Sequence, residues 1–261
     1  MAMNKVVVGQ SVTAGQMKDF WRQVDDGSIG GDYFQDFLAH KLERKDGNTV
    51  SEVTTPKIVI PNLLSTPPTL ADWLKAREEL HKFLTGEQVI LRDIFALTDE
   101  ELASTTLMPA FRPAGATNRN AIYWKIKIGE NKPYEEIDVM KYTNSQGPKQ
   151  PELYIINRSV TPDDDTVGDK AKSPNQLIAH NKLWLGLFCW CDADTLHHVI
   201  TGETLDQKTW TWFPNDRLRY AKVALGYWNP LNRRVYLYWR YAVYCNPNNG
   251  ARSAKKVPIK S

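Results

Sequence analysis

The chain has 261 residues with 42% hydrophobic and 24% charged side chains, and its formal net charge is +3. This composition is typical of a folded globular protein and excludes an intrinsically disordered chain. Every apolar run is far shorter than the ~20 residues of a membrane-spanning helix, and the first residues lack the apolar core of a signal peptide. Three cysteines do not make a disulfide framework, so we expect a cytoplasmic protein with no membrane partner.

The first 42 residues have the pattern of a compact helical hairpin. Thr13 and Gln16 are spaced as a capping box, and apolar side chains at helical intervals follow them. Gly27 is suited to end this helix, and a second amphipathic helix comes after it. Two short helices bury little surface alone, so we expect the hairpin to pack on the rest of the chain or on a protein partner.

Residues 12–41, with the sequence VTAGQMKDFWRQVDDGSIGGDYFQDFLAHK, resemble a short N-terminal module of uncharacterised proteins from candidate-phylum bacteria with reduced genomes. The resemblance rests on FWRQV in the first helix, on the glycine-bearing turn and on FQDFL in the second helix. It implies a modular helical hairpin. It implies no activity and no site residue.

Residues 43–68 are polar at first and then rich in proline, which is typical of a linker. Thr69 then has the position of an N-cap, with Asp72 in the first turn and an apolar stripe of helical period behind it. Gly86 follows the last residue of the stripe and is suited to end the helix.

A second capping box, Thr98 with Glu101, begins another helix, and Pro109 closes that segment in the prediction. Residues 69–110 are therefore predicted to be a helical segment that packs on a sheet. This sheet is expected in the remainder of the chain.

From about residue 111 the hydrophobic period changes to two, which is the period of a strand. Segment 183–191 is apolar on both faces, as a central strand covered on both sides would be. Short strands without helical patterns between them predict an antiparallel β-sandwich or barrel over residues 111–261, and an α+β fold for the whole chain. The predicted strands are 121–128, 137–142, 152–158, 183–191, 209–213, 222–228 and 233–245.

The densest polar cluster lies in CWCDADTLHH, and no motif of a large enzyme class occurs elsewhere. Thiolates and imidazoles bind zinc, so the cluster offers a candidate zinc site, the one cofactor considered. Against it, two sulfur atoms separated by one residue of a strand lie roughly 7 Å apart, and buried cysteines behave as small hydrophobes. The candidate zinc ligands are Cys189, Cys191, His197 and His198.

The same cluster supports a second interpretation, an enzyme with a site around residues 189–198. In it a cysteine is the nucleophile, His197 is the base that activates it, and Asp192 or Asp194 orients the base. Nothing in the local sequence places the cysteine where its pKa would fall, so we favour a protein that is not an enzyme.

Segment 233–245 alternates core-like residues with an aromatic and basic face. Unpaired bases stack on tyrosine rings while arginines hold phosphates, and sugars stack on such rings as well. Residues 211–261 hold ten basic side chains and one acid, Asp216, which attracts polyanions unless the C-terminal ARSAKKVPIKS is only a solvated tail. The candidate ligand-binding residues are Arg233, Arg234, Tyr236, Tyr238, Arg240 and Tyr244.

Three classes of function therefore remain open. The first, which we favour, is a binding protein whose most specific candidate ligand is single-stranded nucleic acid. The second is the enzyme with a site around residues 189–198. The third is a structural or assembly protein in which the N-terminal hairpin packs against another chain. A separate alternative for the aromatic and basic face is that it packs against the acidic N-terminal helices or against a protein, and binds no ligand.

Overall fold

The structure is a computed structural model that describes residues 66–128, 134–135, 146–229, 231 and 234–260. These residues belong to one compact unit. The expected hairpin, most of the expected linker and the predicted strand 137–142 lie outside the described residues. None of the helices within the described ranges has the length and apolar character needed to cross a lipid bilayer.

The described chain is α+β, as predicted. Its helices are α3 (Leu70–Thr85), α4 (Leu91–Ile94), α5 (Asp99–Ala103), α6 (Asn118–Lys127), the 3-10 turn η1 (Gly168–Lys170), α8 (Pro174–Ala179) and α9 (Leu187–Thr201). Its strands are β1 (Leu107–Arg112), β2 (Tyr134–Glu135), β3 (Glu152–Asn157), β4 (Trp210–Arg217), β5 (Lys222–Asn229), β6 (Arg234–Tyr241), β7 (Asn249–Ala251) and β8 (Ala254–Val257).

The strands form two sheets. The smaller sheet has the order β1-β3-β8 and is antiparallel throughout. The larger has the order β2-β6-β5-β4-β7, in which β2–β6 and β4–β7 are parallel pairs and the two central pairs are antiparallel. Neither sheet closes into a barrel within the described residues.

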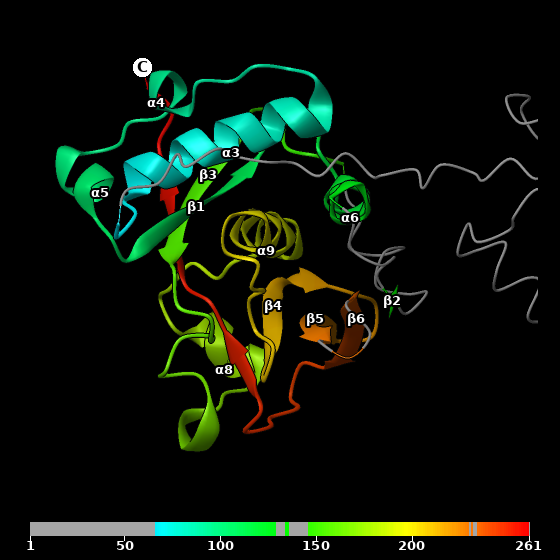
Figure 1. Cartoon of the computed structure of the whole chain (residues 1–261). Coiled ribbons are helices and arrows are strands. Elements are labelled where there is room, and N and C mark those ends of the chain that lie inside the picture. The colour runs from blue at the N-terminus through cyan, green and yellow to red at the C-terminus, as the bar shows by residue number, and fades with distance from the viewer. Residues whose placement is uncertain (1–65, 129–133, 136–145, 230, 232–233, 261) are drawn as a thin grey trace, which may run out of the picture. The chain divides into compact units, whose positions relative to one another are not determined.

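The helix α9 lies between the two sheets, so the sheets do not face each other directly as in a sandwich (Figure 1). It packs on β1 of one sheet and on β5 of the other, while α3 runs along β1 and α8 lies against β4. The first eleven residues of α9, Leu187 to His197, are all buried. A helix with neighbours on every side is expected to be mostly apolar, and the two buried aspartates of α9 are paired with cations.

The predicted strand 183–191 is wrong, and the burial of this segment explains the error. From Trp184 on the segment is largely buried, as its composition indicated, but its residues from Leu187 form the first turn and a half of α9, and Leu183 is 41% exposed. A short apolar run does not distinguish a buried strand from a buried helix.

The predicted strand 121–128 is also wrong, because these residues belong to α6. A capping box precedes it, in which the Thr117 backbone N–H donates to Asn120 Oδ1 at 2.8 Å. In the helix the alternating apolar residues point in different directions. Trp124 is buried and Ile126 is exposed.

The predicted caps of the first two helices are confirmed. The Thr69 backbone N–H donates to Asp72 Oδ2 at 2.9 Å, and Gly86 ends α3 in the left-handed region at φ 82°. Thr98 caps α5 in the same way. Pro109, expected to close the segment, lies instead inside β1, an edge strand, where the missing N–H of proline is tolerated.

The predicted strands 152–158 and 222–228 are confirmed within one residue at their ends as β3 and β5. The predicted strand 209–213 is confirmed as the first part of β4, which continues to Arg217. Strand 233–245 is confirmed as β6 only up to Tyr241. The C-terminal segment is not a solvated tail, because it forms the edge strands β7 and β8 of the two sheets. Its residues Arg252 and Ser253 join one sheet to the other.

Three buried ion pairs connect α9 and the loop after it to the elements around them. Their nitrogen–oxygen distances are between 2.5 and 2.7 Å, and every side chain involved is at most 2% exposed. Since an unpaired charge in the core is costly, each pair holds its two elements together. The pairs are Asp192–Arg77, Asp194–Lys125 and Asp206–Arg252.

Candidate functional site

Four aromatic side chains form a connected cluster on one face of the larger sheet, here named the aromatic face: Trp210, Tyr227, Tyr236 and Tyr238. The ring centroids of Trp210 and Tyr227 lie 4.2 Å apart. Tyr227 pairs with Tyr236 across β5 and β6, and their centroids are 5.7 Å apart. Tyr236 and Tyr238 lie on the same side of β6, with parallel rings 6.2 Å apart.

The opposite side of the same strands belongs to the core around α9. Val235 and Leu237 are fully buried there, in agreement with the alternation predicted for this strand. The alternation is wrong near the end of the segment, where Tyr241 and Val243 are 54% and 75% exposed. The four side chains of the aromatic face are half-buried instead. Each of them therefore keeps part of its surface in contact with solvent.

A cavity of about 160 Å³ adjoins the aromatic face. The guanidinium carbon of Arg240 lies 5.9 Å from the Tyr238 ring centroid, at the distance of a cation–π contact. Arg240 is exposed, and its Nη1 donates to the Trp239 carbonyl oxygen at 2.9 Å. The cavity is lined by Trp210, Leu225, Tyr238, Arg240, Tyr244, Asn246, Asn248 and Asn249.

Hydrogen bonds within the loop that carries Asn246 and Asn248 hold it at the cavity. Asn246 Oδ1 accepts from the Asn248 backbone N–H at 2.8 Å, and Asn246 Nδ2 donates to the Tyr244 hydroxyl at 3.1 Å. Asn249 follows in β7 and pairs with Trp210 of β4. Next to it, a Cβ at Gly250 would lie 2.4 Å from Val167 Cγ1, so only glycine lets the strand approach this closely.

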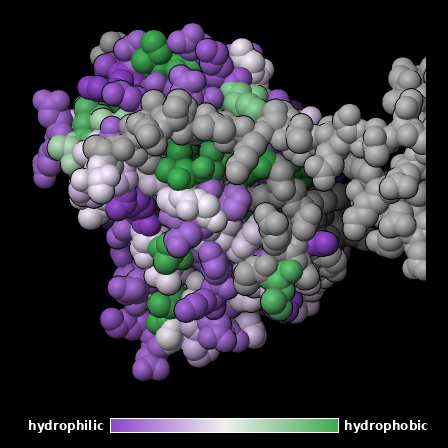
Figure 2. All heavy atoms as spheres, in the orientation of Figure 1, coloured by the Kyte–Doolittle hydropathy of each residue, from purple (hydrophilic) through white to green (hydrophobic). Residues whose placement is uncertain are grey.

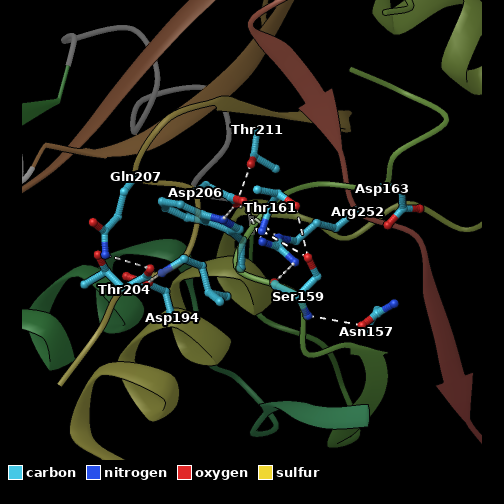
Figure 3. Close-up of polar contacts among 12 residues, drawn as sticks. Asn157, Ser159, Thr161, Asp163, Asp194, Thr204, Asp206, Gln207, Thr211 and Arg252 are labelled. Atoms are coloured by element: carbon cyan, nitrogen blue, oxygen red, sulfur yellow. Dashed lines mark hydrogen bonds and ion pairs between the residues drawn. The ribbon is translucent and has the colours of Figure 1, made fainter. Parts of the chain in front are cut away.

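A buried polar network supports the strands that carry this site (Figure 3). Asp206 Oδ1 accepts from Arg252 Nη2 at 2.5 Å, and Asp206 Oδ2 accepts from Thr211 Oγ1 at 2.5 Å and from Trp190 Nε1 at 2.7 Å. Thr211 is the neighbour of Trp210 in β4, and Arg252 follows β7 directly. The network thus ties the two strands of the cavity to α9.

The structure brings together several of the candidate ligand-binding residues. Tyr238, Arg240 and Tyr244 line the cavity, and Tyr236 stacks beside Tyr238. Arg234 is half-buried at the opposite end of β6, away from the cavity lining. Arg233 lies outside the described residues.

Sequence reasoning missed the other half of the site. Trp210 had a signal, because TWTWF is a strand with alternate tryptophans. Asn246, Asn248 and Asn249 had none, since CNPNNG has the composition of an ordinary turn. Only the pairing of β7 with β4 places these amides beside the aromatic rings.

No protein-family model, curated protein or solved structure matches the chain. The chemistry of the site therefore follows from its own side chains. None of the eight residues that line the cavity has a carboxylate, an imidazole or a thiol, the groups most often used in acid–base and nucleophilic catalysis. Aromatic rings, carboxamides and one guanidinium instead suit a site that binds.

The structure gives the candidate zinc site no support. Cys189 and Cys191 lie on α9, where residues two apart point roughly 200° away from each other around the axis. Across the described residues, no three His, Cys, Asp or Glu side chains converge as the ligands of a metal ion do. The sequence-based distance between the two sulfur atoms assumed a strand, but this segment is helix α9.

The candidate Cys–His nucleophile also lacks its geometry. His197 Nδ1 lies 2.9 Å from the Glu203 carbonyl oxygen, and its ring stacks on that of Trp73. His198 lies one residue further along α9, with its ring beside Trp228. Burial raises the pKa of the Cys189 thiol well above its usual value, so at neutral pH it is not the thiolate that a nucleophile requires.

A second cavity, of about 170 Å³, opens at the first turn of α9, where Cys189 borders it. Asp216, half-buried, accepts a hydrogen bond from the Leu187 backbone N–H at 2.7 Å. Removal from water raises the pKa of the Asp216 carboxyl to about 6, although the Leu187 hydrogen bond and the nearby Arg112 oppose the rise. The other lining groups include Tyr154, whose pKa burial also raises.

Asp216 is expected to make the free energy of unfolding depend on pH. Its folded pKa is above its unfolded value, so its contribution is fully present below about pH 4 and is lost as the pH rises through about 6. The loss is at most about 3 kcal/mol, from a shift of about two units. Urea unfolding of Asp216→Asn, which keeps an acceptor for Leu187, should show the variant gaining stability relative to the native chain from pH 4 to pH 7. Parallel pH profiles of the two proteins would contradict this assignment.

Proposed function

We propose that the chain binds single-stranded nucleic acid through the aromatic face and the adjoining cavity. The observation that carries the proposal is the exposed Arg240 guanidinium beside a connected cluster of partly exposed rings. Bases stack on such rings whatever their sequence, and a guanidinium holds the phosphates between them. A duplex offers no free base faces, so the proposal is for unpaired strands.

The arrangement of the strands supports the proposal in a second way. The face of β6 that carries Tyr236 and Tyr238 is turned away from α9, whose side of the sheet is filled by Val235 and Leu237. On the described surface seen in Figure 2, hydrophobic residues lie in separate patches among hydrophilic ones. The cavity, with aromatic walls and a few polar groups, has the character of a ligand site.

Less of the positive charge of residues 211–261 is free to meet a ligand than the sequence suggested. Arg252 is neutralised in the core by Asp206, while Lys255 and Lys256 form ion pairs with Glu101 and Glu152. Few phosphates can then be contacted. Because each contact contributes to the salt dependence, we expect affinity to fall with salt by a shallow slope.

The test is binding of the purified full chain to fluorescent single-stranded and double-stranded oligonucleotides over a range of salt concentrations. Trp210→Ala and Tyr238→Ala should each weaken single-strand binding by about 5- to 150-fold, which corresponds to the ~1–3 kcal/mol of one stacked base. Arg240→Ala should weaken binding and lower the salt slope by about one.

Matched controls are available in exposed residues that do not line the cavity. Tyr123→Ala on α6 removes a tyrosine that is 61% exposed, and Arg92→Ala removes an exposed arginine on α4. Both should leave the affinity unchanged. Equal losses in controls and site variants, or no binding at low salt, would exclude the proposed function.

A further inference from the structure

The cavity contains one polar side chain that is buried and has no partner. Asn249 is 4% exposed and lines the cavity. Its backbone N–H donates to the Asn246 carbonyl oxygen, but no described residue forms a hydrogen bond with its side-chain amide. Unlike Trp212 Nε1, the amide atoms of Asn249 are not sealed from solvent. They therefore reach the cavity that Asn249 lines.

A buried amide normally has a hydrogen-bond partner in the protein or in an ordered water molecule. Here the missing partner is supplied by whatever enters the cavity. A carboxamide presents an acceptor and a donor side by side, which matches a group that offers a donor and an acceptor in the same spacing. The rings of Trp210 and Tyr238 stand at the same cavity, and their centroids are 5.4 Å apart.

The size of the cavity limits the ligand. Its volume of about 160 Å³ is below the ~300 Å³ at which pockets for whole drug-sized molecules begin. It is suited to one planar ring system, with the rest of the ligand outside on the aromatic face and against Arg240. A base at one position of a bound strand has this form.

We propose that the cavity accepts one unpaired base of the strand, that Asn249 binds the edge of this base, and that adenine is favoured. The inference rests on the proposed function and adds base selectivity to it. Asparagine pairs in two-point fashion with N6 and N7 of adenine, and on this edge guanine offers two acceptors while a pyrimidine offers one polar group. An unpaired base can be splayed out of its stack, so this edge can turn into the cavity. Stacking alone gives only modest preferences between bases, so a preference that depends on the 6-amino group is a property of Asn249 and not of the aromatic face.

The experiment compares the affinity of the full chain for fluorescent single-stranded oligo-dA, oligo-dC and oligo-dT at one salt concentration. The native chain should bind oligo-dA about tenfold more tightly than the others. Asn249→Ala should remove this preference while oligo-dT binding stays within about twofold. An oligonucleotide of purine bases without the 6-amino group should lose the advantage of oligo-dA with the native chain, and should equal oligo-dA with the variant.

Two further variants separate recognition from folding. Asn249→Asp keeps the size of the side chain but cannot donate to a ring nitrogen, so it should also lose the oligo-dA preference. Asn181→Ala, at an exposed asparagine that lines neither cavity, should retain it. Thermal melting of each variant shows that it is folded.

The outcomes distinguish the two proposals. If the native chain binds oligonucleotides with no preference, or if Asn249→Ala keeps the native ranking of the bases, the selectivity proposal is overturned and the proposed function stands. If a base other than adenine is preferred, the assignment of the cavity to adenine is overturned. If no oligonucleotide binds at low salt, both proposals fall.

Discussion

Replacing Asp206 by asparagine is expected to lower the free energy of unfolding by about 3–5 kcal/mol, the cost of removing one partner of a buried ion pair. Asp206 and Arg252 are at most 2% exposed, and Arg252 Nη2 lies 2.5 Å from Asp206 Oδ1. Without the carboxylate, the guanidinium remains in the core with no opposing charge. Asparagine keeps the shape of the side chain and tolerates the left-handed backbone at φ 53°, so the expected loss comes from the missing charge and from the hydrogen bonds that an amide nitrogen cannot accept.

Urea unfolding of the native chain and of Asp206→Asn measures this effect through the shift of the midpoint. The matched control is Asp165→Asn, the same chemical change in the exposed Asp165–Lys182 ion pair. There the expected loss is about 0–1 kcal/mol, because solvent screens an exposed pair. Similar losses in the two variants would contradict the structural role given to Asp206.

The Asp206 variant also tests how the site is supported. Asp206 Oδ2 accepts from Thr211 of β4, and Arg252 follows β7, so the pair lies behind Trp210 and Asn249. If Asp206→Asn is still folded at low temperature, we expect its oligonucleotide binding to weaken as well. The Asp206 network therefore contributes both to the stability of the core and to the positions of the side chains in the site.

Local patterns in the sequence were sufficient for the ends of α3, for the start of α5 and for the strands β3, β5 and β6, although the period-two pattern of 121–128 belongs to helix α6. The Thr69 cap, the Gly86 stop and the alternation around Val235 and Leu237 each depend on neighbours within a few residues. These patterns predict correctly because the residues that make the hydrogen bonds and packing contacts are close together in the sequence.

The central helix was not predictable in this way. Its apolar residues gave the right burial and the wrong secondary structure, because the helix is covered by a sheet on each side. The helix also buries Asp192 and Asp194. In the sequence alone they are typical of solvent-exposed or catalytic acids, but in the structure they form ion pairs with Arg77 and Lys125. These partners are 115 and 69 residues away in the sequence.

The residues of the candidate site also fall into those that a local pattern predicts and those that only distant pairing places. Tyr236, Tyr238 and Arg240 share one strand, and period two was enough to put them on one face. Asn249 reaches them only because β7 pairs in parallel with β4. A parallel pair joins segments that are distant in sequence, and no local pattern specifies it.

Replacing Arg77 by methionine is expected to lower the free energy of unfolding by about 3–5 kcal/mol at pH 7, and by less at low pH. Arg77 Nη2 and Nε lie 2.7 and 3.0 Å from the two oxygens of Asp192, in a pair that is fully buried. Burial already raises the pKa of the Asp192 carboxyl, and Arg77 opposes that rise. Without Arg77 the folded pKa must rise further above the unfolded value. The carboxyl then contributes most stability when protonated at low pH, and this contribution is lost as the pH rises through the folded pKa.

Urea unfolding of Arg77→Met between pH 4 and pH 7 measures this dependence. The double variant Arg77→Met with Asp192→Asn removes both charges and keeps an acceptor for the Phe111 backbone N–H, which lies 2.8 Å from Asp192 Oδ2. It should be more stable than either single variant at pH 7, because neither a lone guanidinium nor a lone carboxylate is left in the core. Arg92→Met, an exposed control on α4, should change stability by less than about 0.5 kcal/mol at every pH. If Arg77→Met were equally destabilised at pH 4 and pH 7, the loss would come from packing against Phe111 and Trp124 and not from the charge of Asp192.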